Sequence, residues 1–323
     1  MRSFPVKYLL TVVISAISFF CTGQDYIQYH RTFNKVDEDI LSENYALALE
    51  RLDSIYNTFD FIYAQHCMKS LQICCVAGDS ARAGKWLEKC FKQGIPFWII
   101  RQNEIARKSI SYSTTQNAIL HRDSLYAIYR SNVNATLAHT IDSLFEIDQR
   151  HTQKVNEGFF LFRPIYSLKW IRYNKRTFKA IDNITKTYVF PCEKTIGLPE
   201  IYNDSASQAE YIRQYGIHLR QWKAYFILLH YFSTKRKIKD DFKDILYENL
   251  KSGNISPFQF ATICNYIFRY SKHSKNKFGT YNYSIDNQRI EIGLNTMEEE
   301  RRNEIICRER RKNGKANAEI ILE

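Results

Sequence analysis

The sequence predicts a mainly all-α protein, and three observations carry this prediction. Gly and Pro are scarce, with 11 and 6 residues in a chain of 323, which disfavours a β architecture with many turns. Apolar residues recur at steps of three and four along most of the chain. A hydrophobic content of 45% and an aromatic content of 15% are typical of a chain that folds around a proper core. We therefore expect a helical hairpin array followed by a helical C-terminal domain.

Residues 1–23 have the features of a secretory signal peptide. Arg2 and Lys7 give a basic start, and the apolar run that follows, 8–20, is shorter than the ~20 residues of a membrane-spanning helix. Small residues precede the cleavage site that we expect after Gly23. The mature chain is therefore predicted to be exported, to the periplasm or the cell exterior, with no transmembrane segment left once the leader is removed.

The cysteines allow two kinds of covalent modification. Cys21 could carry a lipid, but Phe19 and Phe20 stand where a lipid-attachment site has small residues, so a lipoprotein is the less favoured alternative. Seven further cysteines remain, and their spacings do not resemble a zinc site. In the helical register given below, Cys67 and Cys90 face each other across a hairpin. They form either a disulfide or two packed thiols, and packed thiols are the favoured alternative.

The chain is basic, which limits the classes of partner. Its formal net charge is +12, and +10 once Arg2 and Lys7 leave with the leader. For an exported protein the available polyanions are lipid headgroups, surface glycans and cell-wall polymers, so nucleic acid is not an expected partner. The simplest interpretation is that the basic residues are spread over a solvated surface.

Residues 24–130 are predicted to form helical hairpins that resemble tetratricopeptide repeats. Paired helices are expected over 36–94, with a cluster of three acids from Asp37 marking the first helix start. A pattern of Ala, Leu and Ile or Cys that begins at Ala48 returns 35 residues later, at Ala83. This offset is close to the ~34 residues of a tetratricopeptide repeat, in which the small residue lets two helices approach closely.

Residues 131–323 are predicted to form a helical C-terminal domain. Its clearest helix starts at the capping-box pair Ser207 and Glu210 and carries an apolar stripe as far as Leu229. Further helix boundaries are expected at Gly158, Pro164, Gly253, Ser256 and Pro257.

Two segments close to the C-terminus have their own predictions. Apolar and polar residues alternate over 278–292, as in a short hairpin or an extended segment. A charged helix is expected over 296–313, because its acids lead and its bases trail, which complements the helix dipole.

Several short motifs follow one another in residues 140–300. They are Asp148-Gln149, Phe190-Pro191 followed by Gly197, His230, Gly253-Asn254-Ile255-Ser256-Pro257, Phe278-Gly279-Thr280-Tyr281, and Arg289 followed by Gly293-Leu294. In this order they resemble an uncharacterised bacterial family, many members of which are exported. That family carries Asp-Gln, Gly-Phe/Trp-Pro, Gly, His, Gly-x-Ile-x-Pro, Tyr-Gly-Thr-Gln and Arg-x3-Gly-Leu. This chain departs from that family at three positions: Val189 replaces the Gly before Phe-Pro, Asn265 the Asp of the penultimate helix, and Tyr281 the Gln after Gly-Thr. The resemblance implies an architecture, and it implies no mechanism because the family has no established activity.

Four residues are the candidates for a polar site. His230 lies at the edge of the apolar stripe, where it acts either as a general base or anion-binding group, or as a histidine satisfied within the core. Arg289 either binds a carboxylate or phosphate of a ligand or pairs with Asp148 as a structural salt bridge. Thr280, after Gly279, either offers donors to an anion or belongs to a plain turn.

The motifs that the chain lacks shape the functional hypotheses. It contains no His-Glu-x-x-His, Gly-x-Ser-x-Gly, phosphate-binding Gly-rich loop or Cys-x-x-Cys, so no metal or cofactor is expected and the prediction leans away from an enzyme. The leading hypothesis is an exported interaction module of the cell envelope, whose hairpins bind a protein. The alternatives are a hydrolase of envelope or glycan material that uses His230 and Arg289, and attachment to an anionic surface through the basic C-terminal helix.

Overall fold

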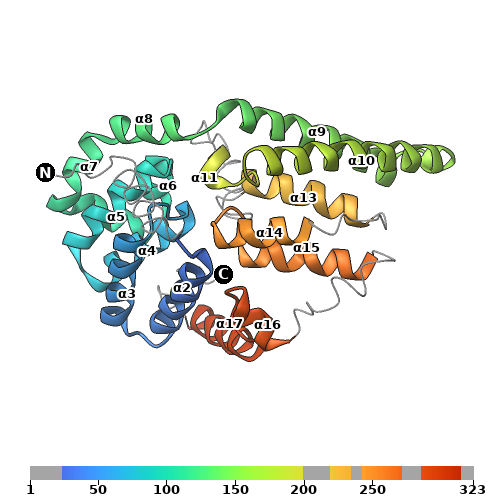
Figure 1. Cartoon of the computed structure of the whole chain (residues 1–323). Helices are drawn as coiled ribbons and strands as arrows, with labels where there is room; N and C mark the ends of the chain where they lie inside the picture. The colour runs from blue at the N-terminus through green and yellow to red at the C-terminus, as the bar shows by residue number, and fades with distance from the viewer. Residues whose placement is uncertain (1–23, 199–218, 234–241, 271–284, 314–323) are drawn as a thin grey trace, which may run out of the picture.

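The computed structural model describes residues 24–198, 219–233, 242–270 and 285–313, and these segments are helical, with no strand. The predicted fold class is therefore confirmed. The N-terminal elements are α2 (Tyr26–Leu41), α3 (Tyr45–Thr58), α4 (Ala64–Ala77), α5 (Ser80–Lys92), α6 (Phe97–Gln102), η1 (Ala106–Ser111), η2 (Ser113–Thr115), α7 (Gln116–Leu120) and α8 (Arg122–Asn132) (Figure 1). The C-terminal elements are α9 (Ala135–Glu157), η3 (Phe160–Phe162), α10 (Arg163–Thr187), α11 (Glu193–Ile196), α13 (Leu219–Ser233), α14 (Phe242–Lys251), α15 (Pro257–Tyr270), α16 (Asp286–Glu291) and α17 (Met297–Lys312). The predicted leader at 1–23, the capping box at Ser207 and Thr280 lie outside the described residues.

The N-terminal part is built from two helical hairpins, α2–α3 and α4–α5, so the predicted hairpin array is present although it begins earlier than residue 36. Ala48 of α3 and Ala83 of α5 are both 0% exposed, so the repeated small residue lies where helices approach each other. The acid cluster from Asp37 was expected to start a helix, and this is wrong, because it lies in the last turns of α2. The helix instead begins after Asp25, whose side chain accepts a hydrogen bond from the backbone N–H of Ile27. Asp37 is held in the helix by a buried ion pair with Lys69.

The long hairpin α9–α10 extends beyond the rest of the molecule, with α13 against it and α14 and α15 next to α13 (Figure 1). Gly158 ends α9, and Pro164 lies in the first turn of α10, as predicted. At the start of α15, Ser256 and Gln259 accept hydrogen bonds reciprocally from each other's backbone N–H. These local signals fix where the helices begin and end.

The prediction of a hairpin or extended segment near 278–292 is wrong for its described part. Residues 286–291 form the short helix α16, and 278–284 lie outside the described residues. The chain turns after α16 at Gly293, whose φ is +91°, and Arg289 donates to the carbonyl of Asn295 at 2.6 Å. The predicted charged helix at 296–313 is present as α17.

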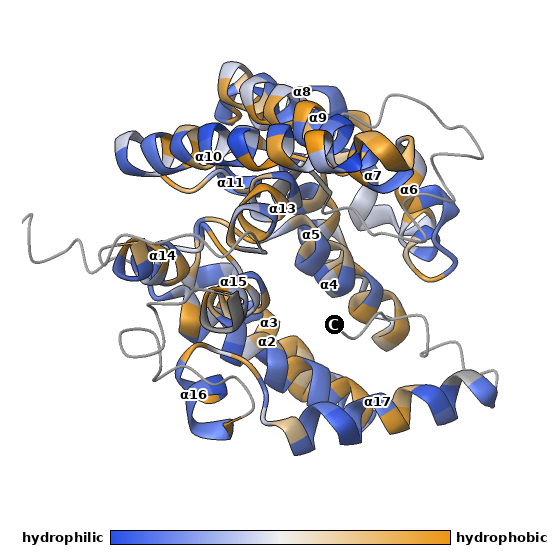
Figure 2. Cartoon of the chain, turned by 90° about the vertical axis from the view of Figure 1, so that its right-hand side faces the viewer, coloured by the Kyte–Doolittle hydropathy of each residue, from blue (hydrophilic) through white to orange (hydrophobic). Residues whose placement is uncertain are grey.

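Two hydrophobic clusters form the interior. The first is made by residues of α2–α8 together with Leu198, and the second by residues from Leu137 to Ile292 together with Ile27 of α2. Each half thus contributes one side chain to the core of the other. Figure 2 shows α17 along the edge of the molecule beside α2. No helix among the described residues has the length and apolar composition that crossing a membrane requires.

The cysteine alternatives are resolved in favour of thiols. All seven described cysteines are free, Cys67 and Cys90 among them, so a disulfide between these two is not formed. Both are 0% exposed, and burial raises the pKa of each thiol, which keeps it protonated. They behave as small apolar side chains at the seam of the hairpin.

Candidate functional site

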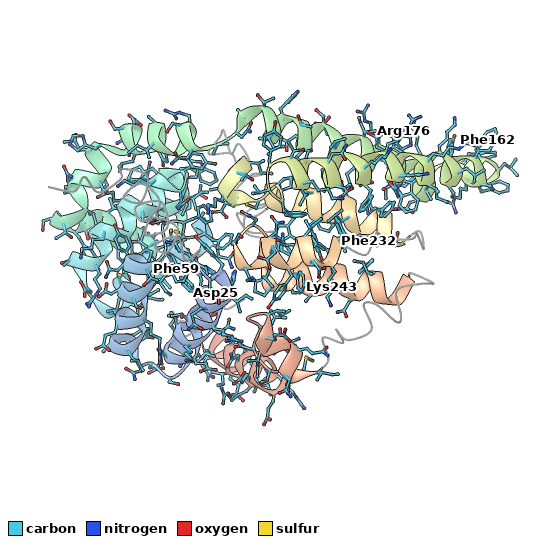
Figure 3. All side chains as sticks on the ribbon, in the orientation of Figure 1. Asp25, Phe59, Phe162, Arg176, Phe232 and Lys243 are labelled. Atoms are coloured by element: carbon cyan, nitrogen blue, oxygen red, sulfur yellow. The ribbon has the colours of Figure 1, made fainter. Side chains whose placement is uncertain are left out.

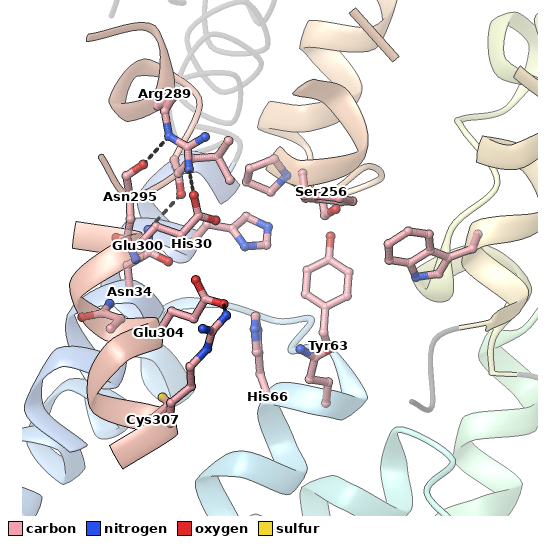
Figure 4. Close-up of a pocket in the computed structure, with 18 residues that line it drawn as sticks. His30, Asn34, Tyr63, His66, Ser256, Arg289, Asn295, Glu300, Glu304 and Cys307 are labelled. Carbon is pink, nitrogen blue, oxygen red and sulfur yellow. Dashed lines mark hydrogen bonds and ion pairs between the residues drawn. The ribbon is translucent and has the colours of Figure 1, made fainter. Parts of the chain in front are cut away.

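A cavity of about 690 Å³ lies between the N-terminal hairpins and the last helices of the chain (Figure 4). One wall comes from α2 and the start of α4, and the opposite wall from α16, α17 and the segment between them. The start of α15 and Trp222 of α13 complete it. Its lining residues are His30, Asn34, Tyr63, Gln65, His66, Trp222, Ser256, Pro257, Phe258, Arg289, Gly293, Leu294, Asn295, Glu300, Asn303, Glu304, Cys307 and Arg308.

The hairpin wall is a packed group of tyrosine, histidine and phenylalanine rings. The ring of His66 stacks on Phe33 at 3.8 Å between centroids, and Tyr63 lies 5.7 Å from His30. The Tyr63 hydroxyl donates to the carbonyl of Gly253 at 2.5 Å, which ties this wall to the C-terminal half. The wall is therefore held in place from both sides of the cavity.

The ring of His66 contacts the hydroxyl of Tyr29 behind this wall. The Tyr29 hydroxyl lies 2.7 Å from Nδ1 of His66 and accepts a hydrogen bond from the backbone N–H of Tyr63. Burial raises the pKa of Tyr29 well above its usual 10.0, so the hydroxyl keeps its proton.

The charged groups of the opposite wall bind one another. Arg289 is 8% exposed, and it donates to a carboxylate oxygen of Glu300 at 2.7 Å (Figure 4). Arg308 forms an ion pair with Glu304 one turn earlier. Because each arginine has a carboxylate beside it, this wall has little net charge.

Side-chain amides lie on both walls of the cavity. Asn34 of α2 donates to the carbonyl of Gly293 at 3.0 Å and links the walls. Gln65 of α4 and Asn303 of α17 also line the cavity, and among the described residues neither side chain has a hydrogen-bond partner. Each amide supplies two donors and an acceptor. With the half-exposed ring of Phe258 near Trp222, the cavity offers polar groups for a neutral ligand and an apolar surface for part of it.

A second polar site joins two of the four residues that the sequence singled out. Nδ1 of His230, on α13, lies 2.6 Å from a carboxylate oxygen of Asp148, on α9. Asp148 is 0% exposed and the His230 side chain 25% exposed. The second oxygen of Asp148 is buried without a hydrogen-bond partner among the described residues. When the ring is neutral, Asp148 accepts from Nδ1–H and leaves Nε2 as an acceptor.

The other two predicted residues are not part of this pair. Arg289 lies in the cavity wall and binds Glu300 and Asn295, so the expected salt bridge between Asp148 and Arg289 is wrong. Asp148 takes His230 as its partner instead because α9 packs on α13, a neighbourhood that the sequence does not reveal. Thr280 lies outside the described residues.

Of the residues that line the cavity, sequence reasoning singled out only Arg289 as a candidate for a polar site. His30 and Asn34 are four positions apart, hence on one face of α2, and this spacing was the one available signal.

Among the described residues there is no group of three or more His, Cys, Asp or Glu side chains arranged to hold a metal ion. Comparison of the chain with protein-family models, with curated proteins and with solved structures gives no match.

Proposed function

We propose that this chain is an exported interaction module that takes an extended segment of a partner protein into the cavity between its hairpins and its last helices. The carrying observation is the pair of amides without partners, Gln65 and Asn303, on opposite walls of that cavity. A peptide group has one N–H and one C=O, which an amide side chain can satisfy together. The hairpins would act as a tetratricopeptide-like pair, with α2 and α4 facing the ligand.

The remaining lining supports a peptide of low net charge. The two arginines of the wall are already paired with Glu300 and Glu304, so a strongly charged segment would have to break an ion pair to bind. Trp222 and Phe258 lie 5.8 Å apart at one end and suit an apolar side chain of the partner. Residues 1–23 would direct the chain to the envelope, where this partner is met.

The proposal is tested by selecting peptides from a displayed random library on the purified mature chain and measuring their affinity by calorimetry. Asn303→Trp fills the cavity and should weaken binding by about tenfold or more. Arg301→Trp places the same side chain on the same helix, at an exposed position that does not line the cavity, and should bind as the wild type does. Enrichment of no peptide, or equal affinity for both variants and the wild type, contradicts the proposal.

A second candidate is a hydrolase of envelope glycan or peptide material that uses His230 as general base. The observation that favours it is the 2.6 Å contact between Nδ1 of His230 and the buried Asp148, which orients a ring whose side chain is 25% exposed. Arg289 has no place in this candidate. Incubation with purified cell-wall material, followed by mass spectrometry of released fragments, tests it. His230→Gln should abolish release and the exposed His139→Gln should not, and absence of release by the wild type rejects this candidate.

A further inference from the structure

The distal end of the α9–α10 hairpin carries an exposed apolar cluster, which we call the hairpin tip. It consists of Phe159, Phe160, Leu161, Phe162, Ile165 and Leu168, with exposed fractions of 56%, 64%, 62%, 49%, 48% and 60%. Figure 3 shows Phe162 at the extreme end of the hairpin, beyond the rest of the molecule. Contiguous apolar groups at such a position mark an interaction site.

The hairpin tip has a defined local structure. Arg163 donates to the carbonyls of Asn156 and Gly158, at 3.1 and 3.2 Å, and so ties the start of α10 to the end of α9. Between them, Phe160–Phe162 form the single 3₁₀ turn η3. The ring of Phe159 contacts that of Phe160 at 5.0 Å between centroids. The rings are thus presented together on a closed turn.

Basic residues surround the hairpin tip, and we call them the basic collar. Residues 150–179 contain eight Lys or Arg and one acid, Glu157, so this segment holds +7 of the net +12 of the chain. All eight side chains are exposed, and none forms an ion pair with another described residue. The collar consists of Arg150, Lys154, Arg163, Lys169, Arg172, Lys175, Arg176 and Lys179. Arg176 lies partway along the hairpin in Figure 3, on the path from the tip to the body.

The C-terminal helix α17, which the sequence suggested for attachment to an anionic surface, carries less net charge than the basic collar. Helix α17 has six basic and five acidic residues and a net charge of +1. Arg310 donates to the carbonyl of Leu41 at 2.6 Å, and Arg308 pairs with Glu304, so both cations already have a partner within the chain. The basic collar, by contrast, gathers eight exposed cations along one hairpin, none of them in an ion pair with another described residue.

We propose that the hairpin tip inserts into the headgroup region of an anionic phospholipid bilayer and attaches the protein peripherally. Aromatic and aliphatic side chains of such a surface typically enter about 5–10 Å into the boundary between headgroups and acyl chains. Lys169 follows Phe162 by seven residues, about 10 Å along a helix, so its long side chain reaches the phosphates when the tip is inserted. A second copy is a poorer occupant, because two basic collars would repel each other.

Vesicle co-sedimentation of the mature chain tests this inference. We expect binding to vesicles of phosphatidylcholine mixed with phosphatidylglycerol, little binding to phosphatidylcholine alone, and loss of binding at high salt. Phe160→Ser/Leu161→Ser should weaken binding by about tenfold or more. Leu120→Ser, at an apolar position on α7 that is 75% exposed, is the matched control and should bind as the wild type does.

A second pair of variants separates the basic collar from total charge. Lys169→Ser/Arg172→Ser should weaken binding to the anionic vesicles, whereas Arg107→Ser/Lys108→Ser removes the same charge from exposed positions of η1 and should not. All substituted side chains are exposed, so the helical fold, checked by circular dichroism, should persist. A Phe160→Trp variant should be quenched by lipids brominated near the headgroup.

Three results would overturn the inference. They are equal binding to neutral and anionic vesicles, no binding to either, and binding that the tip variant leaves unchanged. If the chain without lipid forms a dimer that Phe160→Ser/Leu161→Ser dissolves, a second copy covers the tip and the inference is again overturned. None of these results depends on peptide binding in the cavity, so the two proposals stand or fall separately.

Discussion

Single side chains connect the two halves of the molecule, and Tyr26 is one of them. It is 1% exposed and its hydroxyl donates to the carbonyl of Phe61 at 3.0 Å. Its ring also lies against Gly253, at the end of α14. Burial raises the pKa of Tyr26 to about 12, so the hydroxyl remains neutral far above the usual range.

Tyr26→Phe should therefore have an effect on stability that depends on pH. Loss of the hydrogen bond should lower the free energy of unfolding by about 1 kcal/mol near pH 8. Between the unfolded value of 10.0 and the folded value of about 12, the unfolded wild type releases a proton that the folded wild type retains. Wild-type stability then falls by up to about 1.4 kcal/mol per pH unit, a loss the variant lacks. Between these pH values the free energy of unfolding of the wild type should approach that of Tyr26→Phe or fall below it.

Urea unfolding of Tyr26→Phe and wild type, near neutral pH and in the alkaline window, checks this expectation. Tyr188→Phe, at a position 66% exposed, is the matched control. A stability gap that is the same at both pH values would contradict the assignment of Tyr26 as a buried, neutral donor.

Lys69 and Asp37 form a buried ion pair between α4 and α2, with side chains 4% and 12% exposed. Removing one partner leaves the other charge buried without compensation, so Lys69→Met should cost about 3–5 kcal/mol. Lys69→Met/Asp37→Leu should recover most of that loss. A double-mutant cycle by chemical denaturation measures the coupling, and additive effects of the two substitutions would refute it.

At the same scale, the sequence identified individual residues better than it identified their partners. Asp148, His230 and Arg289 were all singled out, but Asp148 was given the wrong partner. Asp148 and His230 are 82 positions apart, and local spacing says nothing about which distant helices pack together. Contacts across the fold decide which polar groups meet.

At the scale of helices, boundaries were predictable where a local signal acts by itself. Gly158 is the residue that follows the last turn of α9, and Pro164 lies in the first turn of α10, the two places where glycine and proline are enriched. The acids from Asp37 were misplaced because they lie in the last turns of α2, where Asp37 pairs with Lys69 of α4, a partner that local spacing does not reveal. Residues 286–291 belong to the segment for which a hairpin was expected and yet form a helix, and Arg289 in its last turn binds Asn295 and Glu300.

Two helix-terminal glycines give a matched test of packing between elements. Gly78 and Gly253 have φ of +71° and +73°, so alanine is strained at both. A Cβ on Gly78 meets nothing within 4 Å, whereas one on Gly253 would lie 2.5 Å from the Tyr26 ring. Gly78→Ala should cost about 1–2 kcal/mol, and Gly253→Ala about 1–3 kcal/mol more. Urea denaturation measures both, and equal costs would show that Tyr26 does not pack there.

At the scale of the whole molecule, the cavity arises where two cores meet. Ile27 of α2 joins the second hydrophobic cluster and Leu198 joins the first, so the hairpins and the C-terminal helices share a seam. The fold class and most helices could be predicted from periodicity. The cavity could not, because its walls combine His66 of α4 with Asn303 of α17, and only the packing of distant helices brings them together.

The arrangement of the whole molecule also explains why the net charge did not predict where a basic surface lies. The net charge of +12 predicted an anionic partner in general terms. The positive charge of residues 150–179 lies on one surface because α9 and α10 fold back on each other and carry this segment away from the body (Figure 1). The fold thus places on one projecting hairpin a charge that the composition gives only as a total.

The central claim is that a peptide segment binds between the hairpins and the last helices, and amide hydrogen exchange tests it most directly. A peptide selected on the chain should slow exchange in α2, α4 and α17, the walls of the cavity, and leave α8 and the hairpin tip unchanged. Protection confined to α8, or to the outer helices α3 and α5, would place the partner elsewhere and contradict the account.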